Sequence, residues 1–365
     1  MVNEKFLILV INPGSTSTKF ALFENEQALF ERTVRHPPED FADCASITEQ
    51  HDVRLRYIMD ALRERDIRLE NLSAVVGRGG MIAPLASGTY AVNELMLEDL
   101  HGEVAGLHAS CLGAIIAADI AGKYNIPSFV VDPAVVDEMI PEARLSGLPQ
   151  IPRESLFHAL NTKAVGRLCA REMGMDYNDA RFVICHMGGG ITTSAHRYGR
   201  VIDATHGMYG EGAFTPERSG LVYGRGLIEM AFSGNYSKQE LLALMQRNGG
   251  IKAYLGLNDM REVEQRVMRG EAEATLVLRA MIHQLSKDIG GMIAVLGGRC
   301  DAAILTGGIA FSAMIVSMIK EYVAPMAPLK VYPGELEMEA LAQGGLRVLR
   351  GEEKAAVYAG YAGKS

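Results

Sequence analysis

The stretch Ile11-Asn12-Pro13-Gly14-Ser15-Thr16-Ser17-Thr18-Lys19 decides how the chain begins to fold. It follows a continuous apolar run at residues 6–11, which is typical of a buried strand. The Pro-Gly-Ser segment predicts a turn, and residues 19–23 predict a returning strand, so the two strands form a hairpin. Successive N–H groups, hydroxyls and a lysine can surround an anion, although a plain polar hairpin turn has the same pattern.

Two further glycine-rich loops follow buried strands. His186-Met187-Gly188-Gly189-Gly190 comes after the apolar residues 182–185, and Thr306-Gly307-Gly308-Ile309-Ala310 comes after residues 302–305. Glycines at the end of a buried strand weaken it unless a ligand or another backbone needs the space. Three such loops together favour a nucleotide site. The plan of strand, polar or glycine-rich turn, strand and helices occurs near residue 10 and again near residue 185.

Strands and helices alternate along the rest of the chain. We expect further strands at residues 74–77, 128–131, 191–196 and 201–203. We expect helices at residues 53–65, 95–124 with a break at or near Gly102 and Gly106, 156–173, 238–246, 259–269, 271–296, from about 312, and 337–350. This alternation predicts a mixed α/β fold. A chain of 365 residues exceeds one ordinary core. We therefore expect one domain of residues 1–152 with the returning helix 337–365, and a second of residues 153–336.

Composition and charge exclude several functional classes. The net charge of −8 argues against nucleic acid as a partner. The five cysteines form no C-x-x-C pair, which predicts buried free thiols in a reducing compartment. The first apolar run is too short for a secretion signal, and the apolar residues 104–122 contain His108 and Asp119, which favours a buried helix over a membrane span. We expect a cytoplasmic protein without a membrane partner.

The three loops resemble the phosphate and adenosine segments of the actin, sugar-kinase and heat-shock-ATPase superfamily. Within it the chain resembles the acetate kinase family, and most closely the butyrate kinases, which include branched-chain fatty acid kinases. The similar segments run in family order along nearly the whole chain, at residues 11–19, 75–80, 87–93, 131–133, 156–161, 183–190, 216–220, 304–309 and 346–353. The length also suits butyrate kinases, because acetate kinases resemble this chain with extra residues.

The resemblance implies a fold, an activity and partners. The fold is two domains of duplicated actin-like or sugar-kinase-like (ribonuclease H-like) structure, with mixed sheets flanked by helices. The activity is reversible transfer of phosphate from ATP, with Mg²⁺, to butyrate or a similar short-chain or branched-chain fatty acid. We expect a homodimer or a larger homo-oligomer. The alternatives are an acetate or propionate kinase, a sugar kinase with Asp132 as its base, and a non-metabolic ATPase of the same superfamily.

The acceptor chemistry explains which catalytic residues to expect. An aliphatic carboxylate has a pKa near that of Glu, about 4.3, so its attack on ATP needs no general base. It needs alignment and charge neutralisation instead. The resemblance makes Arg78 the grip on the substrate carboxylate, with a structural salt bridge as the alternative. It makes Arg218 the partner of the transferring phosphoryl group, with Arg225 as a competitor, and His158 a γ-phosphate ligand.

The remaining assignments also follow from the resemblance. It assigns ATP to Asn12, Ser15, Ser17, Lys19, His186, Gly188, Gly189, Gly190, Asp259, Arg261, Gly307, Gly308 and Ile309. It assigns Mg²⁺ to Asn12, Asp132 and Glu337, with Glu335 as an alternative to Glu337. It assigns the acyl group to Gly80, Leu107, His108, Phe157 and Pro216, with a core histidine as the alternative at His108. Two glycines after Arg78 leave room for an acyl chain longer than acetate, so we expect selectivity at Gly80.

Overall fold

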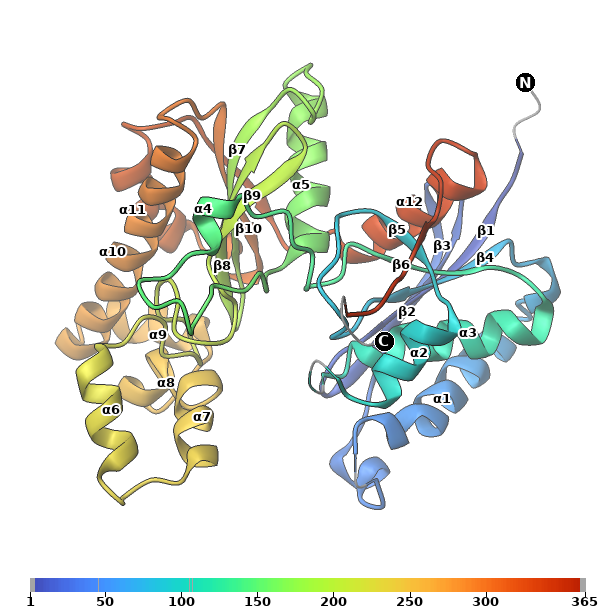
Figure 1. Ribbon diagram of the computed structural model, residues 1–365, viewed down its shortest axis with the longest axis horizontal. Helices are drawn as coiled ribbons and strands as arrows, with labels where there is room; N and C mark the ends of the chain where they lie inside the picture. The colour runs from blue at the N-terminus through green and yellow to red at the C-terminus, as the bar shows by residue number, and fades with distance from the viewer. Residues whose placement is uncertain (1–3, 45, 105, 107, 362–365) are drawn as a thin grey trace. The chain divides into compact units, whose positions relative to one another are not determined.

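The computed structural model describes residues 4–44, 46–104, 106 and 108–361, and its contacts divide the chain into two compact units (Figure 1). Residues 1–136 and 336–365 form the first unit, and residues 137–335 form the second. The units divide at 136/137 and 335/336, whereas the sequence led us to expect 152/153 and 336/337. The last helix returns to the first unit.

A mixed seven-stranded sheet forms the centre of the first unit's described part. Its strands are β1 Leu7–Pro13, β2 Ser17–Glu24, β3 Gln27–Arg35, β4 Ala74–Arg78, β5 Thr89–Ala91, β6 Ser128–Val131 and β12 Ala356–Val357. The strand order is β12-β5-β6-β4-β1-β2-β3. The helices are α1 His51–Arg63, α2 Glu94–His101, α3 Cys111–Tyr124 and α12 Glu337–Leu349, with short 3₁₀ turns η1 Pro38–Phe41, η2 Thr48–Gln50 and η3 Leu69–Asn71.

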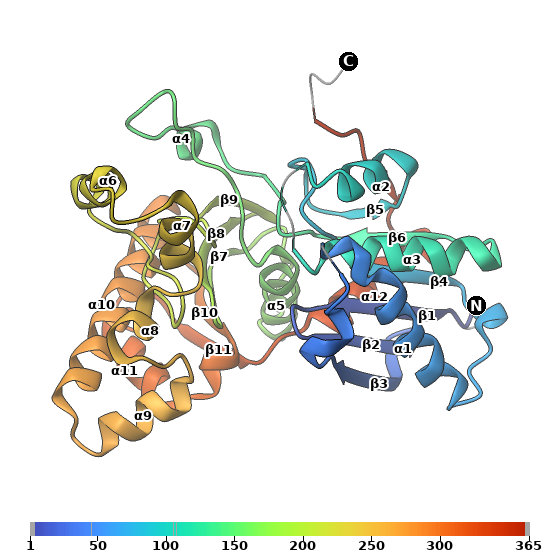
Figure 2. The same cartoon turned by 90° about the horizontal axis from the view of Figure 1, so that it is seen from below.

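Helices α3 and α12 lie on opposite faces of this sheet (Figures 1 and 2). A Cβ atom on Gly77 would meet the carbonyl of Gly113 in α3, whereas a Cβ on Gly345 in α12 would meet the side chain of Val76. Neighbouring residues of a strand point to opposite faces, so Val76 and Gly77 identify the two faces. Both faces of the central strands are therefore covered, which explains the uninterrupted apolar residues of β1 and β4.

The second unit has a five-stranded sheet in its described residues, with the order β11-β10-β7-β8-β9. Its strands are β7 Arg181–Met187, β8 Ile191–Arg197, β9 Arg200–Ala204, β10 Ala302–Gly307 and β11 Leu329–Pro333. Its helices are α4 Pro141–Arg144, α5 Ala159–Glu172, α6 Gly224–Phe232, α7 Lys238–Gln246, α8 Gly250–Leu255, α9 Met260–Met268, α10 Ala272–Val295 and α11 Ala313–Val323, with the 3₁₀ turn η4 Gly308–Phe311. The core joins Val183 and Cys185 of β7 to apolar residues of α10 and α11.

The two sheets share one five-strand plan. The order β6-β4-β1-β2-β3 corresponds strand for strand to β11-β10-β7-β8-β9. In both, a hairpin (β1–β2, β7–β8) pairs its first strand in parallel with a later strand (β4, β10). This correspondence confirms the expected duplicated mixed α/β fold. Each polar or glycine-rich loop lies at the turn of a hairpin or at the carboxyl end of a parallel strand.

Most predicted helices and strands are present with small changes at their ends. The expected helix 95–124 is split into α2 and α3, as its glycines predicted. Helix α7 matches its prediction, and Ser237 and Glu240 form a capping box at its start. All five cysteines are free, and Cys111, Cys169 and Cys185 are buried. Among the described helices, none combines the length and hydropathy required to cross a bilayer.

Candidate functional site

The first polar loop connects β1 to β2 in the first unit. Gly14 N donates to Ser17 O over 2.7 Å and closes the turn, and Ser15 and Thr16 at its tip are exposed. Asn12 lies near the end of β1. Lys19 lies in β2, where its ammonium pairs with Glu31 over 3.0 Å. The loop therefore presents hydroxyls and backbone groups, while the lysine is engaged by the neighbouring strand.

Asn12, Arg78 and Glu337 converge in the first unit. Arg78 Nη1 donates to Asn12 Oδ1 over 3.2 Å and lies 3.0 Å from Glu337 Oε2. Asn12 Nδ2 donates to the same Glu337 oxygen over 2.8 Å. These residues come from the ends of β1 and β4 and from the first turn of α12, so the fold joins positions far apart in the sequence.

Asp132 follows β6 and lies one residue beyond Val131, the register partner of Arg78. Its side chain is buried, with the residue 1% exposed. Oδ1 accepts hydrogen bonds from Ser87 Oγ over 2.6 Å and from Gly88 N over 2.9 Å. These two bonds fix the orientation of the carboxylate.

The residues expected around the acyl group have dissimilar surroundings. A Cβ on Gly80 would lie 2.5 Å from Cys111 Cα and 2.8 Å from Leu100, so its missing side chain is explained by close packing against α2 and α3. His108 is exposed, and its Nδ1 lies 2.9 Å from Ser110 Oγ. Leu107 lies outside the described residues. Phe157 is buried in the second unit, directly before His158.

In the second unit, the imidazole rings of His158 and His186 stack at 3.8 Å with an interplanar angle of 10°. His158 Nδ1 lies 2.8 Å from Thr192 Oγ1. The Nδ2 amide of Asn161 donates to His186 Nδ1 over 2.9 Å, which leaves the His186 proton on Nε2. That nitrogen lies 3.5 Å from Glu335 Oε1. Glu335 therefore lies beside the second loop, whereas Glu337 lies beside Asn12.

Arg218 lies against the third glycine of the second loop. A Cβ on Gly190 would fall 2.1 Å from Arg218 Nη1, so only glycine leaves room for the guanidinium there. Arg218 Nη1 also donates to Gly207 O, and burial lowers the pKa of Arg218. Arg225 has different surroundings: its side chain is 77% exposed on α6 and pairs with Glu229 one turn away.

A pocket of about 640 Å³ adjoins the second loop. Its walls combine that loop with the expected adenosine residues and with Pro216, which we had expected at the acyl group; the lining includes Gly188, Gly189, Pro216, Asp259, Arg261, Gly308 and Ile309. Asp259 caps α9 by accepting from Arg261 N over 3.0 Å and pairs with the Arg261 guanidinium. Gly307 has a φ of +89°, which turns the chain from β10 into the pocket wall.

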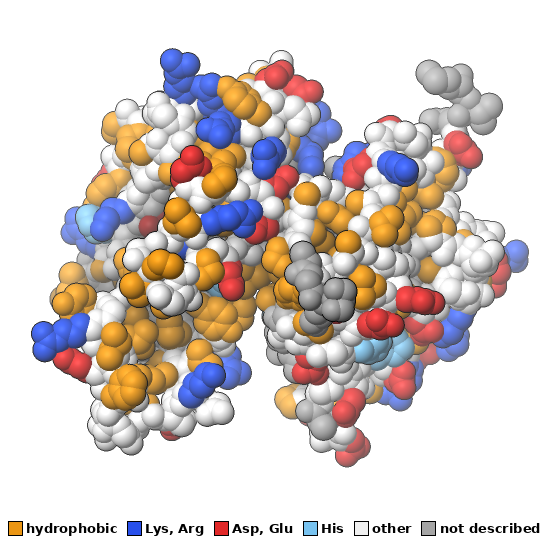
Figure 3. Space-filling model, viewed as in Figure 1, with side chains coloured by type: hydrophobic (Ala, Val, Ile, Leu, Met, Phe, Trp, Pro, Cys, Tyr) orange, Lys and Arg blue, Asp and Glu red, His pale blue; other side chains and the backbone are white. Residues whose placement is uncertain are grey.

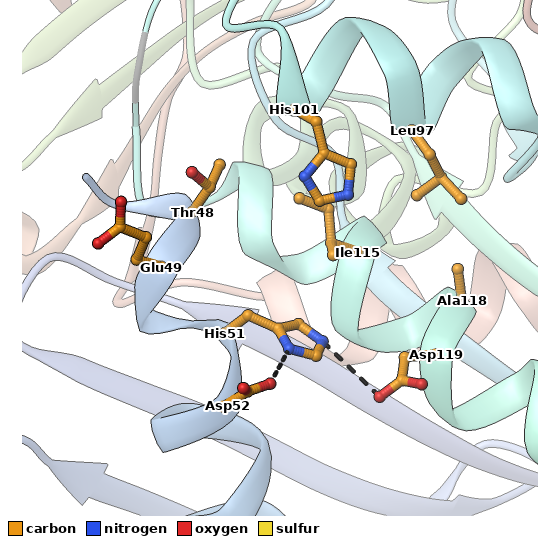
Figure 4. A pocket seen from close by; sticks show the side chains of 9 residues that line it. All are labelled: Thr48, Glu49, His51, Asp52, Leu97, His101, Ile115, Ala118 and Asp119. Carbon is orange, nitrogen blue, oxygen red and sulfur yellow. Dashed lines mark hydrogen bonds and ion pairs between the residues drawn. The ribbon is translucent and has the colours of Figure 1, made fainter. Parts of the chain in front are cut away.

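A second hollow, of about 510 Å³, lies in the first unit and contains none of the expected residues (Figure 4). His51 Nδ1 lies 2.8 Å from Asp52 and Nε2 lies 3.7 Å from Asp119.

No cluster of three or more His, Cys, Asp or Glu suited to a metal occurs in the part of the chain that the structure describes. A magnesium site with few protein ligands does not need such a cluster.

Sequence reasoning missed several supporting residues. Asn161 orients His186, Thr192 contacts His158, and Ser87 binds Asp132. Asn161 stands in a segment that carried the resemblance, so its amide could have been assigned. Arg54 of α1, which binds the first loop, has no such signal, because the predicted helix contains several arginines.

The comparisons with known proteins identify the family. The model of the acetokinase family matches residues 114–347, more than half of the chain. The chain belongs to the acetokinase family. Membership supports a kinase that phosphorylates a carboxylate with ATP.

Solved structures of carboxylate kinases have the same fold. An acetate kinase from Porphyromonas gingivalis gives a TM-score of 0.80 at 19% identity, over 94% of this chain and 100% of that one. A propionate kinase from Francisella tularensis subsp. tularensis SCHU S4 gives 0.76 at 21%, over 93% and 98%. An acetate kinase from Entamoeba histolytica gives 0.73 at 17%, over 93% and 98%. The acetokinase chain thus has the actin-like fold that its sequence predicted.

Proposed function

We propose that this acetokinase-family protein transfers the γ-phosphoryl group of ATP to butyrate or a similar short-chain or branched-chain fatty acid. The order and content of the segments at residues 11–19, 75–80, 156–161, 216–220 and 304–309 support the butyrate branch. The family supports the reaction class.

One observation supports a carboxylate as the acceptor of the phosphoryl group: only one nitrogen of the Arg78 guanidinium is bonded in the described part of the protein. Its side chain is 25% exposed, and Nη1 alone makes its bonds to Asn12 and Glu337. Among the described residues, nothing bonds to its Nε or Nη2. A guanidinium anchored at one nitrogen can offer the rest of its planar fork to both oxygens of a carboxylate.

The reaction balances without a general base. A carboxylate oxygen of the acid attacks the γ-phosphorus, a new O–P bond forms, and the bond from that phosphorus to the β,γ-bridging oxygen breaks. ADP leaves with the electron pair, and no proton is transferred. We assign Arg78 to the carboxylate and Arg218 and His158 to the charge of the transferring group. Ser15, Ser17 and the glycines of the second loop serve the phosphates, and the pocket with Asp259 and Ile309 serves adenosine.

The donor set fits a magnesium ion. Mg²⁺ binds hard oxygen ligands and typically uses one or two carboxylates together with waters and phosphates. Arg78 Nη1 lies 3.2 Å from Asn12 Oδ1 and 3.0 Å from Glu337 Oε2, so the fold brings an amide and a carboxylate oxygen to one place. We assign both residues to the ion, with Asp132 supporting this edge of the sheet. The ion, when bound, would neutralise phosphate charge.

The surroundings of Asp132 argue against a sugar acceptor. A sugar hydroxyl needs a base within hydrogen-bonding reach. Asp132 is 1% exposed, and its Oδ1 is occupied by Ser87 and Gly88. The test incubates the protein with ATP, Mg²⁺ and hydroxylamine and measures acyl hydroxamate. We expect hydroxamate with butyrate and no ADP release above background with glucose or N-acetylmannosamine. Sugar-dependent ADP release without hydroxamate contradicts the proposal.

Acetate or propionate is the second candidate substrate, because structures of an acetate kinase and a propionate kinase share the fold.

We also propose a homo-oligomer in the cytoplasm. Leu221, Tyr223, Ile228 and Phe232 are exposed on and before α6, and Figure 3 shows hydrophobic side chains gathered on that part of the second unit. Exposed apolar patches of this kind commonly mark contact surfaces, and light scattering measures the oligomer directly.

A further inference from the structure

Arg54 lies fully buried beneath the first polar loop, with a relative exposure of 0%. Its Nη1 donates to Gly14 O and Ser17 O, each over 3.0 Å, and to Thr18 Oγ1 over 2.9 Å. Its Nη2 lies 3.3 Å from Ser15 O. One side chain from α1 therefore binds four acceptors of the turn between β1 and β2.

The Arg54 side chain is itself held in place. Gln50 Oε1 accepts from Nε over 3.2 Å and from Nη2 over 2.8 Å. The guanidinium carbon also lies 5.0 Å from the centre of the Phe41 ring. A fork that is anchored on both edges is preorganised, so it loses little further freedom in holding the loop.

These bonds give the loop a polarity. The carbonyls of Gly14, Ser15 and Ser17 bind Arg54, and the carbonyl of Thr16 accepts from His36 N over 2.9 Å. The N–H groups of Ser15 and Thr16 have no hydrogen-bond partner within the residues the structure describes, and both residues are exposed. Consecutive free amides form the kind of concave site that binds anions.

The charge of Arg54 adds to this polarity. Within the described chain, no carboxylate lies at ion-pair distance from its guanidinium. Burial lowers the pKa of Arg54 to about 10, so the group stays charged at neutral pH. Burial and the Arg54 charge together lower the pKa of the neighbouring His36 to about 4, so that ring is neutral there. A single buried cation thus lies behind the loop.

We propose that Arg54 is a positioning residue for phosphoryl transfer: it binds the loop carbonyls from within, which leaves the amides of Ser15 and Thr16 for a phosphate of ATP and adds an uncompensated positive charge behind them. This inference rests on the proposed function, in which the loop serves the phosphates. Arg54 does not touch the substrate, so its effect acts through the loop.

The test compares ATP with adenosine, because only ATP has phosphates for this loop. The adenosine pocket belongs to the second unit and does not involve Arg54. We expect Arg54→Met to weaken ATP binding by about 10- to 100-fold, the range for a displaced positioning group, and to leave adenosine binding unchanged. Arg54→Lys keeps the charge but loses the fork, and we expect an intermediate loss. Arg63→Met is the matched control, because Arg63 is an exposed arginine of the same helix.

Calorimetry gives both affinities, and circular dichroism shows that each variant is folded. An unchanged ratio of ATP to adenosine affinity in a folded Arg54 variant overturns the proposal. If neither Arg54 variant folds, Gln50→Ala decides, because it releases one anchor of the guanidinium: a lower ratio supports the proposal and an unchanged ratio overturns it. Hydroxamate formation by the wild-type protein is measured separately. Its absence counts against the proposed function, whereas the affinity ratio still decides the role of Arg54.

Discussion

At the scale of single residues, two arginines seven positions apart have opposite surroundings. Arg218 is pressed against Gly190 and bonds to Gly207, whereas Arg225 is solvent-exposed and pairs only with Glu229 among the described residues. We expect Arg218→Ala to lower kcat by about 10²- to 10⁴-fold, the range for losing one partner of the transition-state charge. The matched variant Arg225→Ala should retain turnover within about twofold, as for an exposed ion pair. Steady-state kinetics with ATP and butyrate decide; the reverse pattern would show that the wrong arginine was assigned.

Gly190 tests the same contact from the other side. Gly190→Ala places a Cβ where the Arg218 guanidinium lies, so we expect the arginine to move and kcat to fall by a similar factor. The double variant Gly190→Ala with Arg218→Ala should lose little more than either single variant, because both remove one interaction. Gly291→Ala in α10 is the control, since a Cβ there would meet nothing within 4 Å and Gly291 is not among the residues assigned to the site. Fully additive losses would separate Gly190 from Arg218.

Sequence reasoning reached the charged groups of the site more easily than their supports. Arg78, Glu337 and Asn12 were assigned from the resemblance, and the fold joins them through hydrogen bonds. Gly80 was given an acyl role because two glycines suggest space for a ligand. Whether that space is open depends on the residues packed against Gly80, and Cys111 lies where its side chain would be. Arg54 could not be chosen, because its role depends on carbonyls that meet it only in the folded hairpin.

At the scale of elements, α3 approaches β4 through two glycines. A Cβ on Gly113 would lie 2.4 Å from Arg78 O, whereas Gly122 on the same helix has open space around it. We expect Gly113→Ala to destabilise the fold by about 1–3 kcal/mol through overpacking and to lower kcat by displacing Arg78. Gly122→Ala should stabilise by up to about 1 kcal/mol, because alanine favours the helix. Denaturant unfolding gives both values, and equal effects at the two positions would contradict this packing.

Helix α10 carries a carboxyl group that makes stability depend on pH. Asp288 Oδ2 accepts from Ala213 N over 2.7 Å, and burial raises the pKa of Asp288 from 3.8 to about 6. Between these values the folded protein binds more protons than the unfolded chain, so stability falls as pH rises from about 4 to about 6. The slope is at most about 1.4 kcal/mol per pH unit. Asp288→Asn should remove this component, which denaturant unfolding at several pH values measures. The same change in the free energy of unfolding with pH in both proteins would contradict the assignment to Asp288.

Several of the elements that sequence reasoning missed have a weak signal in the sequence. Strand β3 is largely exposed and polar, and β5 and β12 are very short, so neither an apolar run nor an alternating pattern predicts them. Helix α6 begins with two glycines in its first three residues and buries no side chain. Buried strands such as β6 and long helices such as α10 were predicted well, because their buried residues form a clear apolar pattern in the sequence.

At the scale of the whole molecule, one strand plan is used twice, and each copy carries some of the residues that we assign to the proposed reaction. The first unit holds Arg78, Asn12 and Glu337, and the second holds the stacked histidines, Arg218 and the pocket proposed for adenosine. The duplicated hairpins place both loops at equivalent points of their sheets. The fold and the reaction class therefore follow from the sequence, whereas the acyl group depends on packing details that a motif does not record.

The comparison of acyl chain lengths tests the central claim most directly. Butyrate has two more methylenes than acetate, and burying each contributes about 0.8 kcal/mol, or about 15-fold in kcat/KM for the pair. The measurement is kcat/KM of the wild-type protein for acetate, propionate, butyrate, isobutyrate and valerate, with ATP and hydroxylamine trapping. We predict that butyrate, isobutyrate or valerate exceeds acetate by at least about tenfold. Equal values for acetate and butyrate would contradict the butyrate assignment, and no hydroxamate from any acid would contradict the carboxylate kinase itself.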